Sequence, residues 1–182
     1  HIAFHQIVQA DFGIDHLLFV ASLMLIVRDW RILVKTITAF TLAHSITLAL
    51  ASLGLVTLPG PPVEAMIALS ILLVAAEAVR MERGEKSLAI TWPWLVAFCF
   101  GLLHGFGFAG AMLEIGLPQR DVPVALLFFN VGVEIGQLMF ITALLIAANL
   151  VRFVFSFGRS ARIAAAYGIG IVAAFWVIER VD

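Results

Sequence analysis

Long apolar runs alternate along this chain with short polar breaks, and together they predict a bundle of membrane helices. Charged residues, prolines and glycines interrupt the apolar sequence between these runs. A helix that crosses a bilayer needs about 20 mainly apolar residues. Six runs are candidates, at residues 12–28, 32–56, 63–80, 92–113, 122–151 and 161–179. The pattern predicts an all-α, polytopic bundle of about six transmembrane helices, forming a single domain over residues 1–182.

The composition supports this prediction and excludes several other classes of protein. Of the 182 residues, 63% are hydrophobic and 13% are charged, and the mean hydropathy is +1.09. Soluble domains are about half apolar and about a quarter charged, so the lipid bilayer is the expected surrounding. The formal net charge is -1 and the basic residues are scattered, so we expect no nucleic-acid partner. The single cysteine, Cys99, excludes a site built from two thiolates of this chain.

Basic residues are divided unequally between the two ends of the predicted helices. Nine of them flank the first, third and fifth connections: Arg28, Arg31, Lys35, Arg80, Arg83, Lys86, Arg152, Arg159 and Arg162. Only Arg120 and Arg180 flank the opposite end. Because cytoplasmic ends carry the excess of Lys and Arg, we expect the first group inside and both termini outside.

Two segments of the chain resemble each other at an offset of 60 residues. Residues 40–49 read "FTLAHSITLA" and residues 100–109 read "FGLLHGFGFA", so that Phe, Leu, His and Ala recur in register. Duplication and chance similarity between apolar helices both remain possible explanations. In either case the segments start two helices apart, so His44 and His104 should lie on helices that run the same way, at matching depth.

Ionisable residues within the apolar runs are candidates for function, because their burial in a membrane is costly. Asp15 and His16 lie in the first run, His44 in the second, His104 in the fourth and Glu134 in the fifth. With a rise of about 1.5 Å per residue, the last three should reach mid-membrane and the first two the outer third. Imidazole and carboxylate together suit ions such as Ni, Co, Zn or Cu(II), rather than calcium or magnesium. These five residues form the predicted metal site.

Further polar residues are expected to line the same cavity or its approaches: Asp11, Ser45, Glu64, Glu77, Asn130 and Gln137. Structural roles compete with this interpretation. Glu64 follows a proline-rich turn and suits the first turn of a helix, and Glu77 is either an inner ligand or a partner of Arg80 or Arg83. Each histidine, taken alone, is equally well explained by a hydrogen bond to a neighbouring helix.

Two glycine pairs predict where helices approach closely. "GLLHG" at residues 101–105 and "GVEIG" at residues 132–136 have the GxxxG spacing that brings helix backbones together in membranes. Each pair encloses one predicted ligand, His104 or Glu134. We therefore expect the candidate site to lie beside tightly packed helices.

Five segments together resemble the second, less characterised branch of the HupE/UreJ family of membrane proteins: "GIDHLLFV", "FTLAHSITLALASLG", "VEAMIALSILLVAAE", "FGLLHGFGFAGAM" and "FFNVGVEIGQL". The family is associated with hydrogenase and urease accessory functions, and its members are proposed nickel or cobalt permeases. The resemblance implies a multi-pass protein of the bacterial inner membrane. It also implies that an extra-membrane domain or partner lies on the outer side, where the N-terminus is expected.

The chain departs from the better-studied branch at three positions. Gln9 and Phe100 stand where that branch has histidines, and Gly107 stands where it has a glutamate. Asp15, His16 and His104 do carry over. The resemblance therefore implies a metal-handling membrane protein without implying specificity for nickel.

Three functions remain open from the sequence. The favoured one is a divalent transition-metal permease or metal-binding membrane protein that uses Asp15, His16, His44, His104 and Glu134. The second is an intramembrane zinc-dependent hydrolase, although the chain has no G-x-S-x-G or H-E-x-x-H motif. The third is a structural or assembly subunit whose polar groups only hold helices together. An enzyme is therefore the less favoured interpretation.

Overall fold

Local sequence signals set the ends of most helices in the computed structural model. The structure describes the backbone of residues 2–115, 122–154 and 158–181, and the side chains of residues 13–107, 123–147 and 158–181. Within these ranges the chain forms α1 (Ile2–Ile26), α2 (Trp30–Ser52), α3 (Gly60–Glu82), α4 (Leu88–Thr91), α5 (Pro93–Ile115), α6 (Val122–Val154) and α7 (Arg159–Val181). No strand occurs among the described residues. The predicted all-α, polytopic bundle is confirmed.

The helix boundaries differ from the predicted ones where a local signal prevailed. The Asp29 side chain accepts a hydrogen bond from the backbone N–H of Arg31 and so caps α2. This helix ends at Ser52 instead of residue 56 because Gly54 has a positive φ of 72°. At the other extreme, α1 begins ten residues before the predicted start, since the polar residues ahead of the apolar run continue the helix instead of capping it.

Several helices have the length and composition of membrane spans. In the described residues, α2, α3, Pro123–Ala147 of α6 and α7 are long and apolar enough to cross a membrane. The described side chains of α1 and α5 add the shorter apolar segments Gly13–Ile26 and Pro93–Gly107. The protein is therefore a multi-pass membrane protein.

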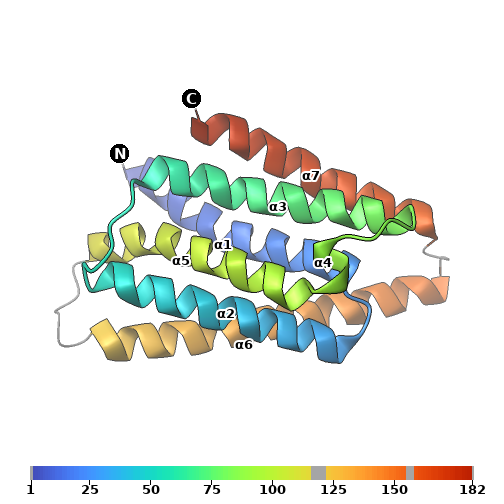
Figure 1. Cartoon of the computed structure of the whole chain (residues 1–182), viewed down its shortest axis with the longest axis horizontal. Helices are drawn as coiled ribbons and strands as arrows, with labels where there is room; N and C mark the ends of the chain where they lie inside the picture. Colours follow the sequence, from blue (N-terminus) through green and yellow to red (C-terminus); the bar gives the residue numbers. More distant parts are fainter. Residues whose placement is uncertain (1, 116–121, 155–157, 182) are drawn as a thin grey trace.

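The long helices alternate in direction along the bundle (Figure 1). α1, α3 and α6 run one way, whereas α2, α5 and α7 run the other, so α1 begins and α7 ends at the same end of the molecule. The opposite end carries a shared ion pair: Glu82 accepts two hydrogen bonds from Arg162, at 2.7 and 2.9 Å, and one from Arg28 at 3.0 Å. This carboxylate connects α3 with α7 and with the connection between α1 and α2.

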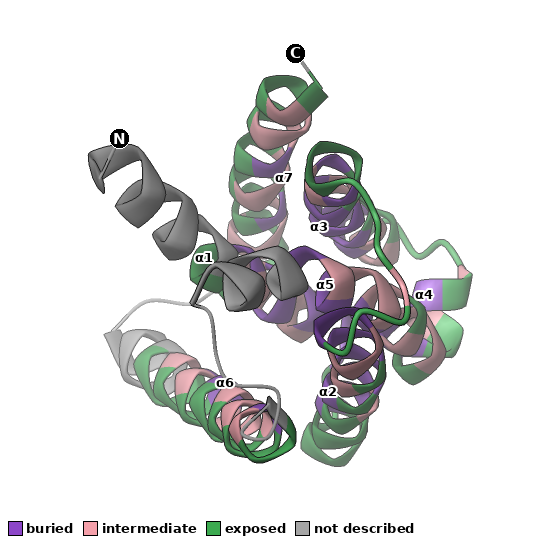
Figure 2. Ribbon diagram, turned by 90° about the vertical axis from the view of Figure 1, so that its left-hand side faces the viewer, coloured by how far each residue is buried: buried purple, intermediate pink, exposed green. Residues whose placement is uncertain are grey.

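The buried core lies among α1, α2, α3 and α5. Phe19, Leu23, Phe40, Ile71 and Val74 are among its fully buried side chains. Figure 2 shows α6 and α7 at the periphery, with mainly exposed residues on their outer faces. Since those faces are apolar, they suit contact with lipid.

The closest helix contact joins α2 and α5. A Cβ atom added to Gly101 would overlap the backbone of Phe40, and one added to Gly105 would overlap the Thr47 side chain and the backbone of His44. The prediction from "GLLHG" is confirmed here, and the contacts show that α2 and α5 run in parallel. By contrast, a Cβ at Gly132 or Gly136 on α6 would meet nothing within 4 Å. The second GxxxG step therefore makes no close contact with the described part of the chain.

Gly105→Ala should separate α2 from α5 and destabilise the protein by about 1–3 kcal/mol, the usual cost of overpacking. The measurement is the thermal unfolding midpoint in detergent. Gly136→Ala is the matched control, because its new methyl group meets no neighbour and alanine favours the helix. Equal destabilisation by both substitutions would contradict the assignment of the close contact to Gly105.

Candidate functional site

Three of the predicted ligands meet inside the bundle. The ring of His16, from α1, lies 5.1 Å from the ring of His44, from α2, and 5.1 Å from the ring of His104, from α5, measured between centroids. Both pairs are edge-to-face, with interplanar angles of 86° and 83°. His44 and His104 are fully buried, and His16 is half-buried. We call these three residues the histidine cluster.

Phenylalanine rings surround the histidine cluster. Phe19 and Phe40 stack on each other at 4.9 Å, and each has its ring centroid 5.1 Å from that of His104. Phe129 of α6 lies 6.5 Å from His44. The close α2–α5 contact brings His44 and His104 to the same level, and the aromatic rings shield them from water.

A serine that the sequence reading did not single out orients His104. Ser70 on α3 donates its hydroxyl proton to the carbonyl of Ile67 at 2.6 Å, and its oxygen lies 2.9 Å from Nε2 of His104. Since a serine has only one hydroxyl proton, Nε2–H of His104 must donate to it. The lone pair of the neutral ring then lies on Nδ1, which is buried without a hydrogen-bond partner among the described residues.

His44 has no hydrogen-bond partner at either ring nitrogen among the described residues, although both atoms are buried. A buried polar atom left without a partner costs about 1–3 kcal/mol. Buried groups of this kind call for an explanation such as a functional role or a bound ion. The structural explanation of His44, a hydrogen bond to a neighbouring helix, has no support in this arrangement.

Asp15, a predicted ligand, is held by an arginine. Arg180 of α7 approaches the two carboxylate oxygens at 3.0 and 3.3 Å, and Asp15 is fully buried. The same guanidinium donates to the backbone carbonyl of Glu64 at 3.1 Å and lies 5.2 Å from the Trp176 ring centroid. Arg180 was missed as a site residue, although an isolated arginine at the expected outer end of an apolar helix was a visible signal.

Glu134 lies at the interface between α6 and α2. Its carboxylate accepts a hydrogen bond from Thr38 at 2.8 Å, and one turn further along Gln137 accepts one from Thr41 at 3.3 Å. Asn130 donates to the carbonyl of Leu126 in its own helix. Glu134 and Gln137 thus contact α2 at Thr38 and Thr41, which precede His44 in the chain. Glu134 bonds to a threonine and not to a histidine.

The remaining predicted polar residues have mainly local partners. Ser45 donates to the carbonyl of Thr41, at 2.6 Å. Glu77 pairs with Arg80 at 2.8 Å, which was one of the two alternatives considered for it. The side chain of Asp11 lies outside the described residues.

The described side chains do not form a ready-made metal site. No group of three or more His, Cys, Asp or Glu residues among them is arranged to hold a metal ion. The histidine rings are close and lie edge to face, but the described side chains are not arranged to hold an ion between them. With His104 held by Ser70, an ion bound at its Nδ1 would require the rings of His16 and His44 to turn toward it.

Comparison with protein families identifies the chain. A family model described as "HupE / UreJ protein" matches residues 3–180, nearly the whole sequence. The chain belongs to the HupE/UreJ family. Neither the curated proteins nor the solved structures gave a match. The resemblance found in the sequence motifs is therefore confirmed, and the family match spans the histidine cluster and the Asp15–Arg180 pair of this HupE/UreJ protein.

Arg180→Gln should destabilise the protein by about 3–5 kcal/mol, because it leaves the buried carboxylate of Asp15 without its charge partner. The double substitution Asp15→Asn with Arg180→Gln should restore much of the loss, since it removes both charges. Thermal unfolding in detergent measures both effects. The control is Arg28→Gln, which removes an exposed guanidinium from a carboxylate that keeps Arg162 as its partner, so its loss should be about 1 kcal/mol or less. A loss no larger than that of the control would contradict a structural role for the pair.

Proposed function

We propose that this HupE/UreJ protein is a permease for a divalent transition-metal ion, and that the histidine cluster binds the ion. The observation that carries the proposal is the meeting of three buried or half-buried imidazoles from α1, α2 and α5. Nδ1 of His104 and both ring nitrogens of His44 lack hydrogen-bond partners among the described residues. Neutral imidazole nitrogen is the common ligand of Zn, Ni, Co and Cu ions.

The spacing of the rings supports binding of a single ion. A Zn–N bond of about 2.0–2.1 Å places a ring centroid about 3.2 Å from the metal, so two histidines at tetrahedral angles have centroids about 5.2 Å apart. The observed separations from His16 are 5.1 Å. His16 is thus already at the distance of a shared ion from each of the other two rings, and rotation of His16 and His44 would be needed to point nitrogen atoms at it.

Asp15 and Glu134 remain predicted ligands that must exchange partners before they bind. Asp15 would have to release Arg180, and Glu134 would have to release Thr38. Such exchange suits transport, because a ligand with a competing partner holds the ion less tightly. The family's association with hydrogenase and urease accessory functions favours nickel or cobalt as the cargo, and zinc and copper fit the same ligands. We place the protein in the bacterial inner membrane with its N-terminus outside.

The alternative is an intramembrane zinc-dependent hydrolase. It would need a coordination position open to water beside the histidines, and Glu134 or Asp15 as the general base. Glu134 accepts a hydrogen bond from Thr38, and Asp15 is paired with Arg180, so either base would first have to leave its partner.

Vesicles that contain the purified protein and a metal-sensitive dye should show saturable uptake of Co²⁺. His44→Ala or His104→Ala should reduce the uptake to the level of empty vesicles, because each removes a nitrogen ligand. Cys99→Ala is the control, since Cys99 lies on the same helix as His104 but its side chain is exposed, whereas that of His104 is fully buried. Tight Co²⁺ binding without flux would contradict transport and favour the hydrolase. Normal folding without any bound metal would favour a structural subunit.

Ser70→Ala should weaken Co²⁺ binding about 10–100-fold, the usual cost of losing a group that orients a metal-bound histidine. Equilibrium dialysis of the protein in detergent measures the affinity. Ser22→Ala is a closely matched control: Ser22 is equally buried and also donates to the carbonyl three residues earlier, at 2.7 Å, but no bond joins it to the cluster. A similar loss of affinity in both variants would count against the role of Ser70.

A further inference from the structure

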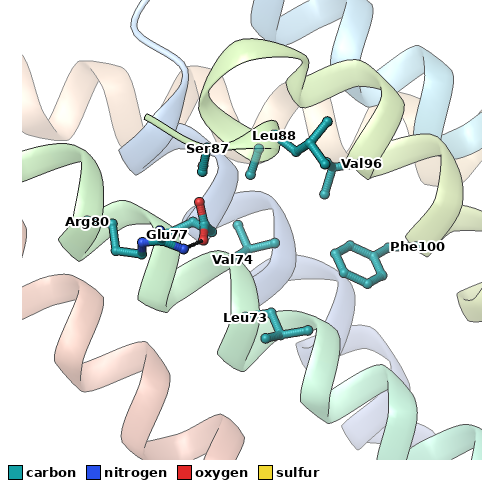
Figure 3. A pocket seen from close by; sticks show the side chains of 9 residues that line it. Leu73, Val74, Glu77, Arg80, Ser87, Leu88, Val96 and Phe100 are labelled. Carbon is teal, nitrogen blue, oxygen red and sulfur yellow. Dashed lines mark hydrogen bonds and ion pairs between the residues drawn. The ribbon is translucent and has the colours of Figure 1, made fainter. Parts of the chain in front are cut away.

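A pocket of about 320 Å³ lies between α3 and the segment formed by α4 and α5. Figure 3 shows Glu77 and Arg80 on one side of this pocket and Phe100 on the other. Leu73, Val74 and Val96 supply part of its apolar lining. The connection before α4 belongs to the end of the bundle that carries most of the basic residues, the expected cytoplasmic end.

The pocket lies further along the same two helices that position His104, α3 and α5. On α3, Ser70, Val74 and Glu77 have the spacing i, i+4, i+7 and so share one face. Glu77 is therefore about 10 Å along the helix axis from the serine that binds His104. On α5, Phe100 precedes His104 by four residues, about 6 Å along the axis. The histidine cluster and the pocket thus follow each other along the α3–α5 interface.

Two phenylalanine rings separate the pocket from the histidine cluster. Phe100 lines the pocket and contacts Phe19 edge to face, with centroids 5.9 Å apart. Phe19 in turn lies 5.1 Å from His104. Phe19 is fully buried and Phe100 is half-buried, so the two rings form an aromatic partition between the pocket and the histidine cluster.

Glu77 has an oxygen atom to spare for a cation. Its Oε1 accepts from Arg80 at 2.8 Å, while its Oε2 is buried without a hydrogen-bond partner among the described residues. Arg80 also donates to Glu85 at 2.9 Å. Arg80 can therefore release Glu77 and keep a carboxylate partner, which leaves the carboxylate of Glu77 available to an ion in the pocket.

We infer that this pocket is the inner vestibule of the ion route, with Phe100 as its gate and Glu77 as the carboxylate that holds the ion between the histidine cluster and the basic end of the bundle. The inference rests on the proposed permease function. One carboxylate beside an arginine binds a divalent cation weakly, which suits a position from which the ion must leave.

Cysteine accessibility tests the vestibule in the full chain. Val96→Cys is introduced into the Cys99→Ala background, which is first shown to carry Co²⁺ in vesicles. A cationic, water-soluble methanethiosulfonate reagent should then modify Val96→Cys and lower Co²⁺ flux at least tenfold. Co²⁺ binding in detergent should stay within twofold, because the histidine cluster lies beyond the partition. Leu42→Cys, on an exposed apolar face of α2, is the control that should remain unmodified.

The outcomes separate the vestibule from the permease function. If Val96→Cys does not react, or carries full flux after modification, the vestibule is wrong while transport stands. If the Cys99→Ala protein itself carries no Co²⁺, the permease function fails, and the vestibule fails with it.

Charge substitutions test Glu77 separately. Glu77→Gln should lower Co²⁺ flux about tenfold and leave Co²⁺ binding unchanged in detergent. Asp29→Asn removes one negative charge from the same end of the bundle, retains a side chain that can cap α2, and spares both Glu77 and Arg80, so its flux should fall less than threefold. Equal losses in the two variants would overturn the role of Glu77, since they would reflect the overall charge of this end.

Discussion

The close contact between α2 and α5 is the constraint on which the candidate site depends. Gly101 and Gly105 leave no room for a side chain, so the two helix backbones run in parallel at a short distance. This register puts His44 and His104 at one level of the bundle. α1 passes beside them at the same level and contributes His16. A wider helix spacing would separate the three histidines from one another.

The buried carboxylates near the site and at the opposite end of α7 are each paired with arginine. Asp15 is held by Arg180 in the interior, and Glu82 is shared by Arg162 and Arg28 at the other end of α7. Removing both partners of a buried ion pair usually costs far less than removing one. The proposed metal site would thus receive its cation next to a carboxylate that already has a positive partner, and competition between the two cations would tune the affinity.

The fold class, the common direction of the two histidine helices and a close helix contact at Gly101 and Gly105 could be predicted from the sequence, but not that α2 and α5 are the two helices in contact. These features depend on hydrophobic periodicity, composition and the spacing of small residues. All three can be observed in a single sequence without knowing how the helices pack. The sequence did not predict the partners of Asp15, Glu134 or His104, because Arg180, Thr38 and Ser70 come from other helices whose rotation about their axes depends on packing. Ser70 gave no signal, since a serine in a membrane helix usually bonds only within its own helix.

α7 contributes few buried residues, yet each of its ends is fastened by an arginine to a carboxylate of another helix. It also packs along α3, so its position does not depend on these two ion pairs alone. Of the two carboxylates, only Asp15 lies next to the histidine cluster. A cation that displaced Arg180 from Asp15 would leave the guanidinium on the Glu64 carbonyl and the Trp176 ring, while Arg162 still held Glu82. The ion pair could therefore open and close with α7 in place, so that ligand exchange would need no movement of the helix.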